Sequence, residues 1–580
     1  MPLLKRYIKM QRIIKRSPLA VVTALFLIPA VLGGCVSGQL GQKNSTEYRN
    51  GMVVSAKQQA SKVGVDILKK GGNAIDAAVA VQFALAVVYP NAGNIGGGGF
   101  MVYRSAKGET NTLDYREKAA GGASRDMYLD AAGAPIVDKS LYGSLAAGVP
   151  GSVAGMIEAH EKYGKLAWAD LVQPAIDLAE KGFEISERQA RELNELHDRF
   201  VQLNPEGTAL IKDGKWSPGE RLVQKELAHT LELIRDKGRS GFYEGEVADA
   251  VVAEMKRSGG IITSIDLKNY KAIWRKPIIG QYKGFKIITM PPPSSGGIAL
   301  VQLLKSVEPY PLKKWGFNTD STVQVMVEAE RRAYADRATH LGDPDFYKVP
   351  GQELMKAAYI KERMSNFDWN KATPSSEVKA GVVTASEHEE TTHYSIVDKE
   401  GNAVSITTTL NGSYGSCVVV KGAGFLLNNE MDDFSVKPGA PNMYGLVGGE
   451  ANAIAPNKRM LSSMTPTIIE KNGDLFMVVG TPGGSTIITS VFQTILNVIE
   501  FDQSMQGAVA SKRFHHQWLP DEVQVEEGAL DSLTEARLKS KGYIIKPRGP
   551  IGRVDAVLKT KWGYYQGGAD PRGDDRAIGW

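Results

Sequence analysis

The segment 391–410 places the strongest constraint on how this chain can fold. Residues 391–398 (TTHYSIVD) alternate between polar and apolar side chains, a turn follows at 399–402, and residues 403–410 (AVSITTTL) are again rich in β-branched side chains. Two such runs around a short glycine-containing turn predict a β-hairpin. The polar residues 366–390 before it show no periodicity, which is typical of an exposed loop. The hairpin therefore begins abruptly, at two consecutive threonines.

The rest of the chain predicts a mixture of helices and strands. Strands are expected at 100–104, 112–116 and 475–479, and helices at 56–70, 74–88, 330–340 and 487–501 and through much of 150–275. The apolar run 74–88 is too short to cross a bilayer, so we expect a buried core helix. The glycines 96–99 lack the spacing of a phosphate-binding loop and predict a close-packed turn before a strand.

Composition excludes several classes of protein. With 43% hydrophobic and 23% charged residues among 580, the chain is neither disordered nor collagen-like. Two cysteines exclude a disulfide scaffold and a thiolate-rich zinc site. Eight histidines leave a histidine-ligated metal arithmetically possible. His515 and His516 are adjacent, would point apart on a strand and have no third ligand at a suitable spacing, so a structural role is favoured and no metal or cofactor is expected.

The N-terminus has the pattern of an export signal. Six basic and no acidic residues fall in 1–34, an apolar run spans 19–32, and Leu32-Gly33-Gly34-Cys35 follows. This ending resembles the lipobox of bacterial lipoproteins, which implies a signal peptide at 1–34, lipid modification of Cys35 and a polar tether at 35–50. An ordinary signal peptide with a chance cysteine is the alternative. Val36 in place of Asp favours the outer membrane, with the protein exported to the periplasmic side.

Removal of that leader changes the meaning of the overall charge. The whole chain has a formal net charge of +5, but the part after residue 34 has −1. The basic balance therefore belongs to a targeting segment, and no nucleic-acid partner is expected. The membrane is expected to be reached through the lipid anchor only.

The strand at 475–479 runs through Gly480-Thr481-Pro482 into Gly483-Gly484 and then a helix. Free backbone N–H groups at a helix start, beside the positive end of the helix dipole, favour an anion or an oxyanion. This segment is therefore a candidate part of an active site.

Several segments together resemble one enzyme family. The run Glu389-Glu390-Thr391-Thr392-His393-Tyr394-Ser395 resembles the processing site of the γ-glutamyltranspeptidases, or glutathione hydrolases. Further matching segments, in the same order and spacing, are 290–297, 429–434, 458–466, 483–485 and 513–520. The resemblance extends from about residue 48 to the C-terminus. It implies an α/β (α+β) fold of the N-terminal nucleophile hydrolase type, a four-layer αββα sandwich.

The same resemblance implies that the chain cuts itself between Glu390 and Thr391. The products would be a large subunit, 51–390 after the tether, and a small catalytic subunit, 391–580, which form the sandwich jointly. Cleavage would free the α-amino group of Thr391, whose pKa of about 8 in reference peptides suits a base for its own hydroxyl. No separate triad is then needed, and no G-x-S-x-G motif occurs in the sequence.

The resemblance also assigns roles in the site, by position. Thr391 would be the nucleophile and Thr409 its support, and Gly483 and Gly484 would form the oxyanion hole. A γ-glutamyl group ends in a carboxylate and an ammonium. The residues that match the family's contacts to these two groups are Arg116, Ser462 and Ser463 for the carboxylate, and Asn411, Glu430 and Asp433 for the ammonium.

Residues 438–449 (PGAPNMYGLVGG) resemble a lid loop of bacterial members, with Tyr444 able to close over the acyl group. A closed site excludes water, which favours transfer as well as hydrolysis. The expected substrates are glutathione and other γ-glutamyl compounds, with water, amino acids or peptide amines as acceptors and no cofactor.

Two alternatives remain open from the sequence. Related acylases with the same fold and a threonine nucleophile act on glutaryl-type side chains, but they need no ammonium pocket, so Asp433 and Glu430 argue against this activity. A non-catalytic, lipid-anchored binding protein is the second alternative, and Thr391, Thr409 and Gly483-Gly484 argue against it.

Overall fold

The computed structural model describes residues 46–378, 391–437, 439, 442–443, 445–446 and 448–580. Cys35, Glu390 and Tyr444, all singled out above, lie outside the described residues. All the described residues belong to one compact unit.

Two antiparallel seven-stranded sheets form the centre of this unit. The first has the strand order β1 (Glu47–Tyr48), β18 (Tyr565–Ala569), β17 (Asp555–Lys559), β13 (Asp474–Gly480), β12 (Thr467–Lys471), β9 (Phe285–Thr289), β8 (Ile278–Tyr282). The second has the order β19 (Arg576–Gly579), β2 (Met52–Ser55), β10 (Thr392–Val397), β11 (Ala403–Thr409), β3 (Gly98–Arg104), β4 (Thr110–Asp114), β7 (Ile273–Arg275). Smaller sheets join β14 (Phe514–His515), β15 (Val523–Glu526) and β16 (Ile545–Arg548), and β5 (Phe183–Glu184) with β6 (Arg221–Leu222).

The two large sheets stack through a shared apolar core. Val54 and Phe100 from one sheet belong to the same buried cluster as Ile288, Ile468 and Val478 from the other. Since strand side chains alternate between faces, each sheet also presents an outer apolar face that helices must cover.

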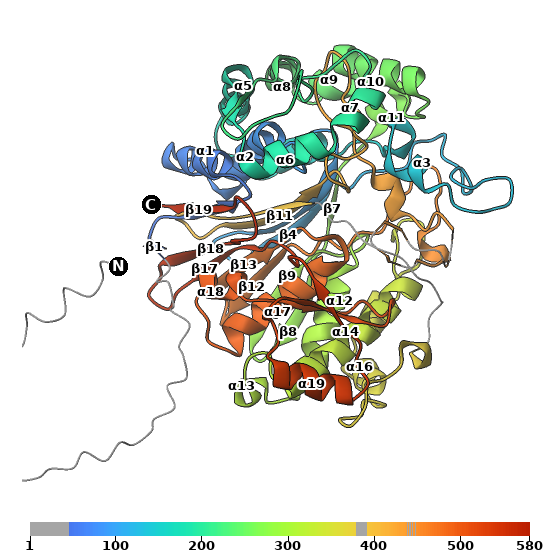
Figure 1. Ribbon diagram of the computed structural model, residues 1–580. Coiled ribbons are helices and arrows are strands. Elements are labelled where there is room, and N and C mark those ends of the chain that lie inside the picture. Colours follow the sequence, from blue (N-terminus) through green and yellow to red (C-terminus); the bar gives the residue numbers. More distant parts are fainter. Residues whose placement is uncertain (1–45, 379–390, 438, 440–441, 444, 447) are drawn as a thin grey trace, which may run out of the picture. The chain divides into compact units, whose positions relative to one another are not determined.

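Helices cover both outer faces, as Figure 1 shows. On the β10–β11 side lie α1 (Gln58–Lys69), α2 (Ala74–Val88), α4 (Ser152–Tyr163), α5 (Trp168–Lys181) and α8 (Lys225–Lys237). On the β12–β13 side lie α12 (Gly296–Val307), α14 (Asp320–His340), α17 (Ile487–Ile499) and α18 (Met505–Ala510). The expected four-layer αββα architecture is confirmed.

The other helices are α3 (Val137–Leu141), α6 (Glu187–Glu195), α7 (His197–Leu203), α9 (Ser240–Tyr243), α10 (Gly245–Ser258), α11 (Ser264–Asn269), α13 (Leu312–Trp315), α15 (Gly351–Leu354), α16 (Ala357–Arg363) and α19 (Ser532–Ser540). Helix α2 is buried along its whole length, as its sequence predicted. Its start is fixed by a capping box between Asn73 and Asp76. In the described part of the chain, no helix is long and apolar enough to cross a membrane.

The boundaries of two predicted elements need correction. The strand expected at 112–116 is β4, which ends at Asp114, so Arg116 lies beyond the strand and is free to turn towards the neighbouring loops. The helix expected at 487–501 begins at Ile487 as predicted, directly after a single 3-10 turn, Gly484–Thr486, but α17 ends at Ile499.

Both sheets interleave strands from before and after Thr391. In one sheet β10 and β11 lie between β2 and β3, and in the other β12, β13, β17 and β18 lie between β1 and β9. Neither part of the chain could complete either sheet alone. The predicted joint construction of the sandwich by residues on both sides of Thr391 therefore agrees with the strand order.

Candidate active site

Thr391 lies immediately before β10, at the end of the sandwich where β11 finishes. Its side-chain oxygen is 3.4 Å from the hydroxyl of Thr409, the last residue of β11. The Thr409 hydroxyl also accepts a hydrogen bond from the backbone N–H of Asn411 at 2.7 Å. Thr391 is 4% exposed, so this hydroxyl pair is almost fully enclosed. The hairpin geometry thus holds the predicted nucleophile against its predicted support.

The glycines predicted as a close-packed turn at 96–99 support this arrangement, although Gly98 and Gly99 form the start of β3, the strand beside β11, and only Gly96 and Gly97 precede it. A side-chain carbon on Gly97 would lie 2.0 Å from the carbonyl oxygen of Thr409. The two backbones can approach this closely only because residue 97 has no side chain.

A pocket of about 290 Å³ opens beside Thr391 and brings most of the predicted site together. Its walls are formed by Arg116, Arg337, Thr391, Thr409, Asn411, Glu430, Asp433, Leu446, Ser462, Ser463, Met464, Gly484 and Ile487. Of the predicted residues that the structure describes, only Gly483 is not part of this wall, and it directly precedes Gly484. The residues come from widely separated parts of the chain, so the fold assembles the pocket.

A compact charge cluster lines one side of the pocket. Arg116 places Nη1 at 2.6 Å from Glu430 Oε2, binds Asp433 through Nη2, and has Glu117 at 3.5 Å. Burial disfavours the charged guanidinium, but Glu430 and Asp433 outweigh that effect and raise the pKa of Arg116. Burial raises the pKa values of Glu430 and Asp433, while Arg116 opposes this. The cluster thus holds two predicted ammonium acceptors against the predicted carboxylate donor.

The serine pair directly follows Leu461, whose carbonyl accepts a hydrogen bond from Nη2 of Arg116 at 3.3 Å, and Ser462 forms a backbone bridge with Ser294. The Ser462 carbonyl accepts hydrogen bonds from the backbone N–H and the hydroxyl of Ser295, at 2.8 and 2.6 Å. The Ser463 hydroxyl accepts a hydrogen bond from Nη2 of Arg337 at 3.1 Å. Ser295, in the family-matching segment 290–297, thereby fixes Ser462, and Arg337 fixes Ser463.

Two charged residues at this site were not predicted. Glu117 is fully buried beside Arg116, and burial raises the pKa of its carboxyl to about 8. Arg337 reaches the pocket from α14, far from any predicted site segment. Its position in a charged helical stretch gives no local signal, because only the packing of α14 decides which of its arginines faces the pocket.

The glycine pair forms the turn between β13 and α17. Gly483 and Gly484 both have positive φ, 134° and 49°, a conformation that residues with side chains rarely adopt. The Thr481 hydroxyl, just before them, accepts a hydrogen bond from the backbone N–H of Arg553 at 2.7 Å. The conformation of this turn is therefore stabilised by the hydrogen bond from Arg553 as well as by the two glycines.

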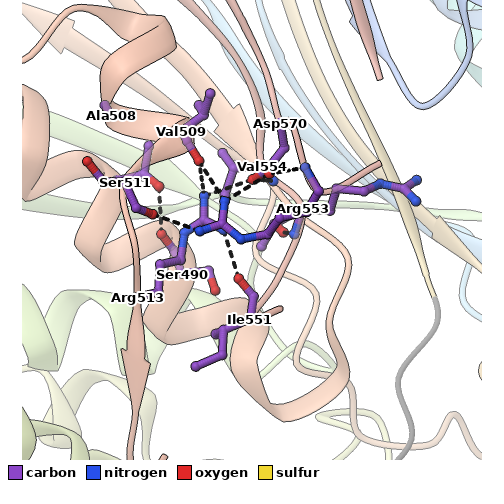
Figure 2. A network of polar contacts seen from close by, with 12 residues as sticks. Ser490, Ala508, Val509, Ser511, Arg513, Ile551, Arg553, Val554 and Asp570 are labelled. Atoms are coloured by element: carbon purple, nitrogen blue, oxygen red, sulfur yellow. Dashed lines mark hydrogen bonds and ion pairs between the residues drawn. The ribbon is translucent and has the colours of Figure 1, made fainter. Parts of the chain in front are cut away.

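A buried ion pair stabilises the segment that carries Arg553. Figure 2 shows Arg513 among the carbonyls of Val509 and Ile551 and the carboxylate of Asp570. The Asp570 carboxylate also accepts from the Val554 backbone N–H at 2.9 Å. This network connects α18, the loop before β17 and the end of β18, and so fixes the backbone that contacts the glycine turn.

The described part of the lid segment packs over the acidic side of the pocket. The Asn442 side chain donates to Asp433 at 3.1 Å, and the Met443 backbone N–H donates to Asp432 at 2.9 Å. Leu446 lines the pocket. Asp432 itself is not a wall residue and serves to hold this segment, together with Ser140 at 2.7 Å. The position of a lid is thus coupled to the predicted ammonium acceptor Asp433.

The histidines near the site are buried, and His393 and His515 bond only neutral side chains. His393 bonds the hydroxyls of Thr407 and Ser395, and burial lowers its pKa to about 3. His515 bonds Thr489 and Gln517, and His516 contacts Asp521. Over the described residues, no group of three or more His, Cys, Asp or Glu side chains is arranged to hold a metal ion.

Comparisons with known proteins agree with this geometry. The family model described as "Gamma-glutamyltranspeptidase" matches residues 60–580. The "Glutathione hydrolase proenzyme" of Escherichia coli (strain K12) is 48% identical over 535 residues, which cover 92% of each chain.

Two solved structures agree at the level of fold. A cephalosporin acylase from Bacillus halodurans has a TM-score of 0.80 at 26% identity and covers 95% of this chain and 99% of its own. A chain of the Helicobacter pylori gamma-glutamyltranspeptidase has a TM-score of 0.55 at 46% identity and covers 58% of this chain and 96% of its own. The higher identity lies with the transpeptidases and the acylase shares the architecture. The chain belongs to the gamma-glutamyltranspeptidase family.

Proposed function

We propose that this enzyme cuts itself before Thr391 and then moves the γ-glutamyl group of glutathione, or of a related γ-glutamyl compound, to water or to an amine. The observation that carries the proposal is the hydroxyl of Thr391, 3.4 Å from that of Thr409, on the wall of a pocket that also holds Arg116, Glu430 and Asp433. A nucleophile beside acidic and basic side chains suits a substrate with a zwitterionic end.

Self-cleavage uses the same hydroxyl as the later reaction. The Thr391 oxygen attacks the carbonyl carbon of Glu390, the C–N bond of that peptide breaks, and the released amine takes a proton. The resulting ester is hydrolysed by water, which leaves a carboxylate on Glu390 and a free α-amine on Thr391. That amine can then accept the proton of its own hydroxyl in each turnover.

Turnover follows in two acyl transfers. The Thr391 oxygen attacks the γ-carbonyl of the donor, and the Gly483-Gly484 turn provides backbone N–H groups for the oxyanion. The leaving amine takes a proton and departs, and the γ-glutamyl group remains as an ester on Thr391. Water or an acceptor amine then attacks this ester, which releases glutamate or a new γ-glutamyl amide and restores the hydroxyl.

The charge cluster explains why a zwitterionic donor would be favoured. In the free protein Arg116 is paired with Glu430 and Asp433. A γ-glutamyl head brings one carboxylate and one ammonium, so it can insert between these partners and satisfy both signs. A glutaryl head brings only the carboxylate and would leave Glu430 and Asp433 without a counter-charge. This supports the transpeptidase activity over that of a glutaryl acylase.

A denaturing gel and an activity assay test the proposal together. Purified wild-type protein should give two bands, of about 355 and 190 residues, and release the amine from a γ-glutamyl anilide. Thr391→Ala should give one band and no release. A single band and no turnover in the wild type would instead support a non-catalytic binding protein, and cleavage in Thr391→Ala would show that another residue is the nucleophile.

We further propose that Cys35 carries lipid and anchors the exported protein on the periplasmic side of a bacterial membrane, with the outer membrane favoured. The basic start, the apolar run 19–32 and the sequence Leu32-Gly33-Gly34-Cys35 support this. Several acyl chains give stable anchoring. Metabolic labelling with a fatty acid should mark the wild type and not Cys35→Ser. Label in the variant, or none in the wild type, would overturn the proposal.

A further inference from the structure

Arg337 is a buried guanidinium that faces the pocket from α14. The residue is 5% exposed and belongs to the same pocket wall as Thr391. Its Nε donates to the Ser295 hydroxyl at 3.0 Å, and its Nη2 donates to the Ser463 hydroxyl at 3.1 Å. Both partners are neutral, so these bonds satisfy N–H groups without balancing the charge.

The lack of a carboxylate partner distinguishes Arg337 from the other buried arginines of the described chain. Each of the others forms an ion pair: Arg104, Arg116, Arg331, Arg332, Arg459, Arg513 and Arg553. Among the described residues, no carboxylate oxygen lies within 4.0 Å of the Arg337 guanidinium. A buried, unpaired charge is costly unless an anion joins it. Such a charge on a pocket wall therefore indicates where a ligand anion belongs.

Arg116 is in the opposite situation. Two carboxylates bind it directly, and Glu117 adds a third at 3.5 Å. Its positive charge is already matched before any substrate arrives. Arg337, by contrast, bonds Ser463 and has no carboxylate within ion-pair distance among the described residues, although the charge of Asp433 acts on it from farther away.

The hydrogen-bond directions show how Arg337 prepares the serines. Arginine only donates, so the hydroxyl oxygens of Ser295 and Ser463 must both accept from it. The Ser295 hydroxyl in turn donates a hydrogen bond to the Ser462 carbonyl at 2.6 Å. The Ser463 proton has no acceptor among the described residues, and Ser463 lines the pocket. One O–H group is therefore left to donate into the pocket.

We propose that Arg337 is a positioning residue for the α-carboxylate of the donor: it orients the Ser463 hydroxyl towards that carboxylate and adds its positive charge to that of Arg116. The inference rests on the proposed γ-glutamyl substrate. The carboxylate would then lie beside Arg116, Ser463 and Arg337, and the ammonium beside Glu430 and Asp433.

The test compares two glutamine-like inhibitors of the processed enzyme. L-Glutamine carries the α-carboxylate, and 4-aminobutanamide is the same molecule without it. Competition against a γ-glutamyl anilide gives the inhibition constant of each. Arg337→Gln should raise the constant for glutamine at least tenfold and that for 4-aminobutanamide less than twofold, and should raise KM for the anilide more than it lowers kcat.

Equal changes for the two inhibitors, or no change for either, would overturn the proposal. Arg337→Lys keeps the charge without the two-pronged geometry. This variant should raise the inhibition constant of glutamine more than that of 4-aminobutanamide, by a smaller factor than Arg337→Gln does. It provides the measurement if Arg337→Gln does not cleave itself. Arg332→Lys, on the same helix and paired with Glu328, is the matched control and should leave both constants unchanged.

Failure of the proposed function is distinguishable from failure of this inference. Without the proposed activity, the wild type itself would release no amine from the anilide. The role of Arg337 is decided only by the ratio of variant to wild type for the two inhibitors.

Discussion

Nη1 of Arg116 lies 2.6 Å from Oε2 of Glu430, so two residues expected to bind opposite ends of the substrate head bind each other. Asp433 joins the same guanidinium. The pocket is therefore internally paired before substrate binds, and a donor must exchange protein–protein ion pairs for protein–substrate ones. Such an exchange favours a ligand that carries both charges.

Substitution of Asp433 tests this exchange. Asp433→Asn removes one negative acceptor, and a hydrogen bond to a charged group contributes about 1.5–3 kcal/mol. We expect kcat/KM to fall by about tenfold to a hundredfold for a γ-glutamyl anilide and to fall less for a glutaryl anilide, which has no ammonium. Asp432→Asn, at the neighbouring residue outside the pocket wall, should affect both donors equally. A uniform loss in Asp433→Asn would contradict an ammonium site.

The support of Thr391 by Thr409 gives a second prediction. Thr409→Val removes the hydroxyl that lies 3.4 Å from Thr391 and that accepts from the Asn411 N–H at 2.7 Å. We expect slow self-cleavage, visible on a time-resolved gel, and a loss of kcat of about a hundredfold, the lower end for positioned proton-transfer groups. Thr409→Ser keeps the hydroxyl and should recover most of both. Equal defects in the two variants would assign the effect to packing instead.

Local patterns were sufficient for the elements that build the site. The alternation over 391–410 predicted β10 and β11, and the apolar run 74–88 predicted α2 with the same bounds. The glycines 96–99 predicted a close turn, which holds for Gly96 and Gly97, packed against the carbonyls of Leu426 and Thr409, whereas Gly98 and Gly99 already belong to β3. These signals are local because periodicity and backbone freedom depend on neighbours in sequence.

The missed features depend on contacts across the fold. Nothing near residue 337 distinguishes Arg337 from Arg331 or Arg332, and only the packing of α14 aims it at Ser463. The resemblance located Arg116, but not its pairing with Glu430, residues more than three hundred positions apart in sequence. Charge balance inside a pocket is a property of the assembled structure, so it could not be predicted from motifs.

Three buried histidines predict sensitivity to acid. Burial lowers the pKa values of His393 and His515 to about 3 and that of His516 to about 4. The unfolded chain binds these protons near pH 6.5, so stability is full above that pH and is lost as the pH falls towards 4. Between these two pH values, each histidine lowers the free energy of unfolding by about 1.4 kcal/mol for every pH unit.

Urea unfolding at pH 7.5, 6 and 5 measures this dependence. His393→Gln keeps a polar side chain beside Thr407 and Ser395 but does not titrate. Between pH 7.5 and pH 5 the free energy of unfolding of His393→Gln should fall by about 2 kcal/mol less than that of the wild type. This difference does not depend on how stable the variant is at pH 7.5. The difference between the two slopes isolates His393 from the buried carboxyls, which titrate in both proteins. Parallel slopes would sink this prediction.

The lid segment gives a prediction on the fate of the acyl group. The Asn442 side chain binds Asp433, and Tyr444 is the predicted cover of the site. Asn442→Ala and Tyr444→Ala should both loosen the lid and admit water, which raises the ratio of hydrolysis to transfer severalfold. Product analysis at a fixed concentration of acceptor amine gives this ratio. Lys437→Ala, which removes only an exposed contact to Gly133, should leave it unchanged. An unaltered ratio in both lid variants would remove the proposed link between this segment and transfer.

Gly97 provides the sharpest test of how the fold positions the nucleophile. In Gly97→Ala the added carbon would lie 2.0 Å from the carbonyl of Thr409, and backbone on both sides prevents an easy adjustment. Overpacking of this kind costs about 1–3 kcal/mol, and here the strain falls on the residue that supports Thr391. We expect a lower midpoint of thermal unfolding and impaired self-cleavage. Gly549→Ala, where an added carbon meets nothing within 4 Å and φ is not positive, is the control and should change neither. Normal processing in Gly97→Ala would mean that β3 can move away from β11 without disturbing Thr409. The active site would then tolerate larger backbone movements than the close contacts indicate.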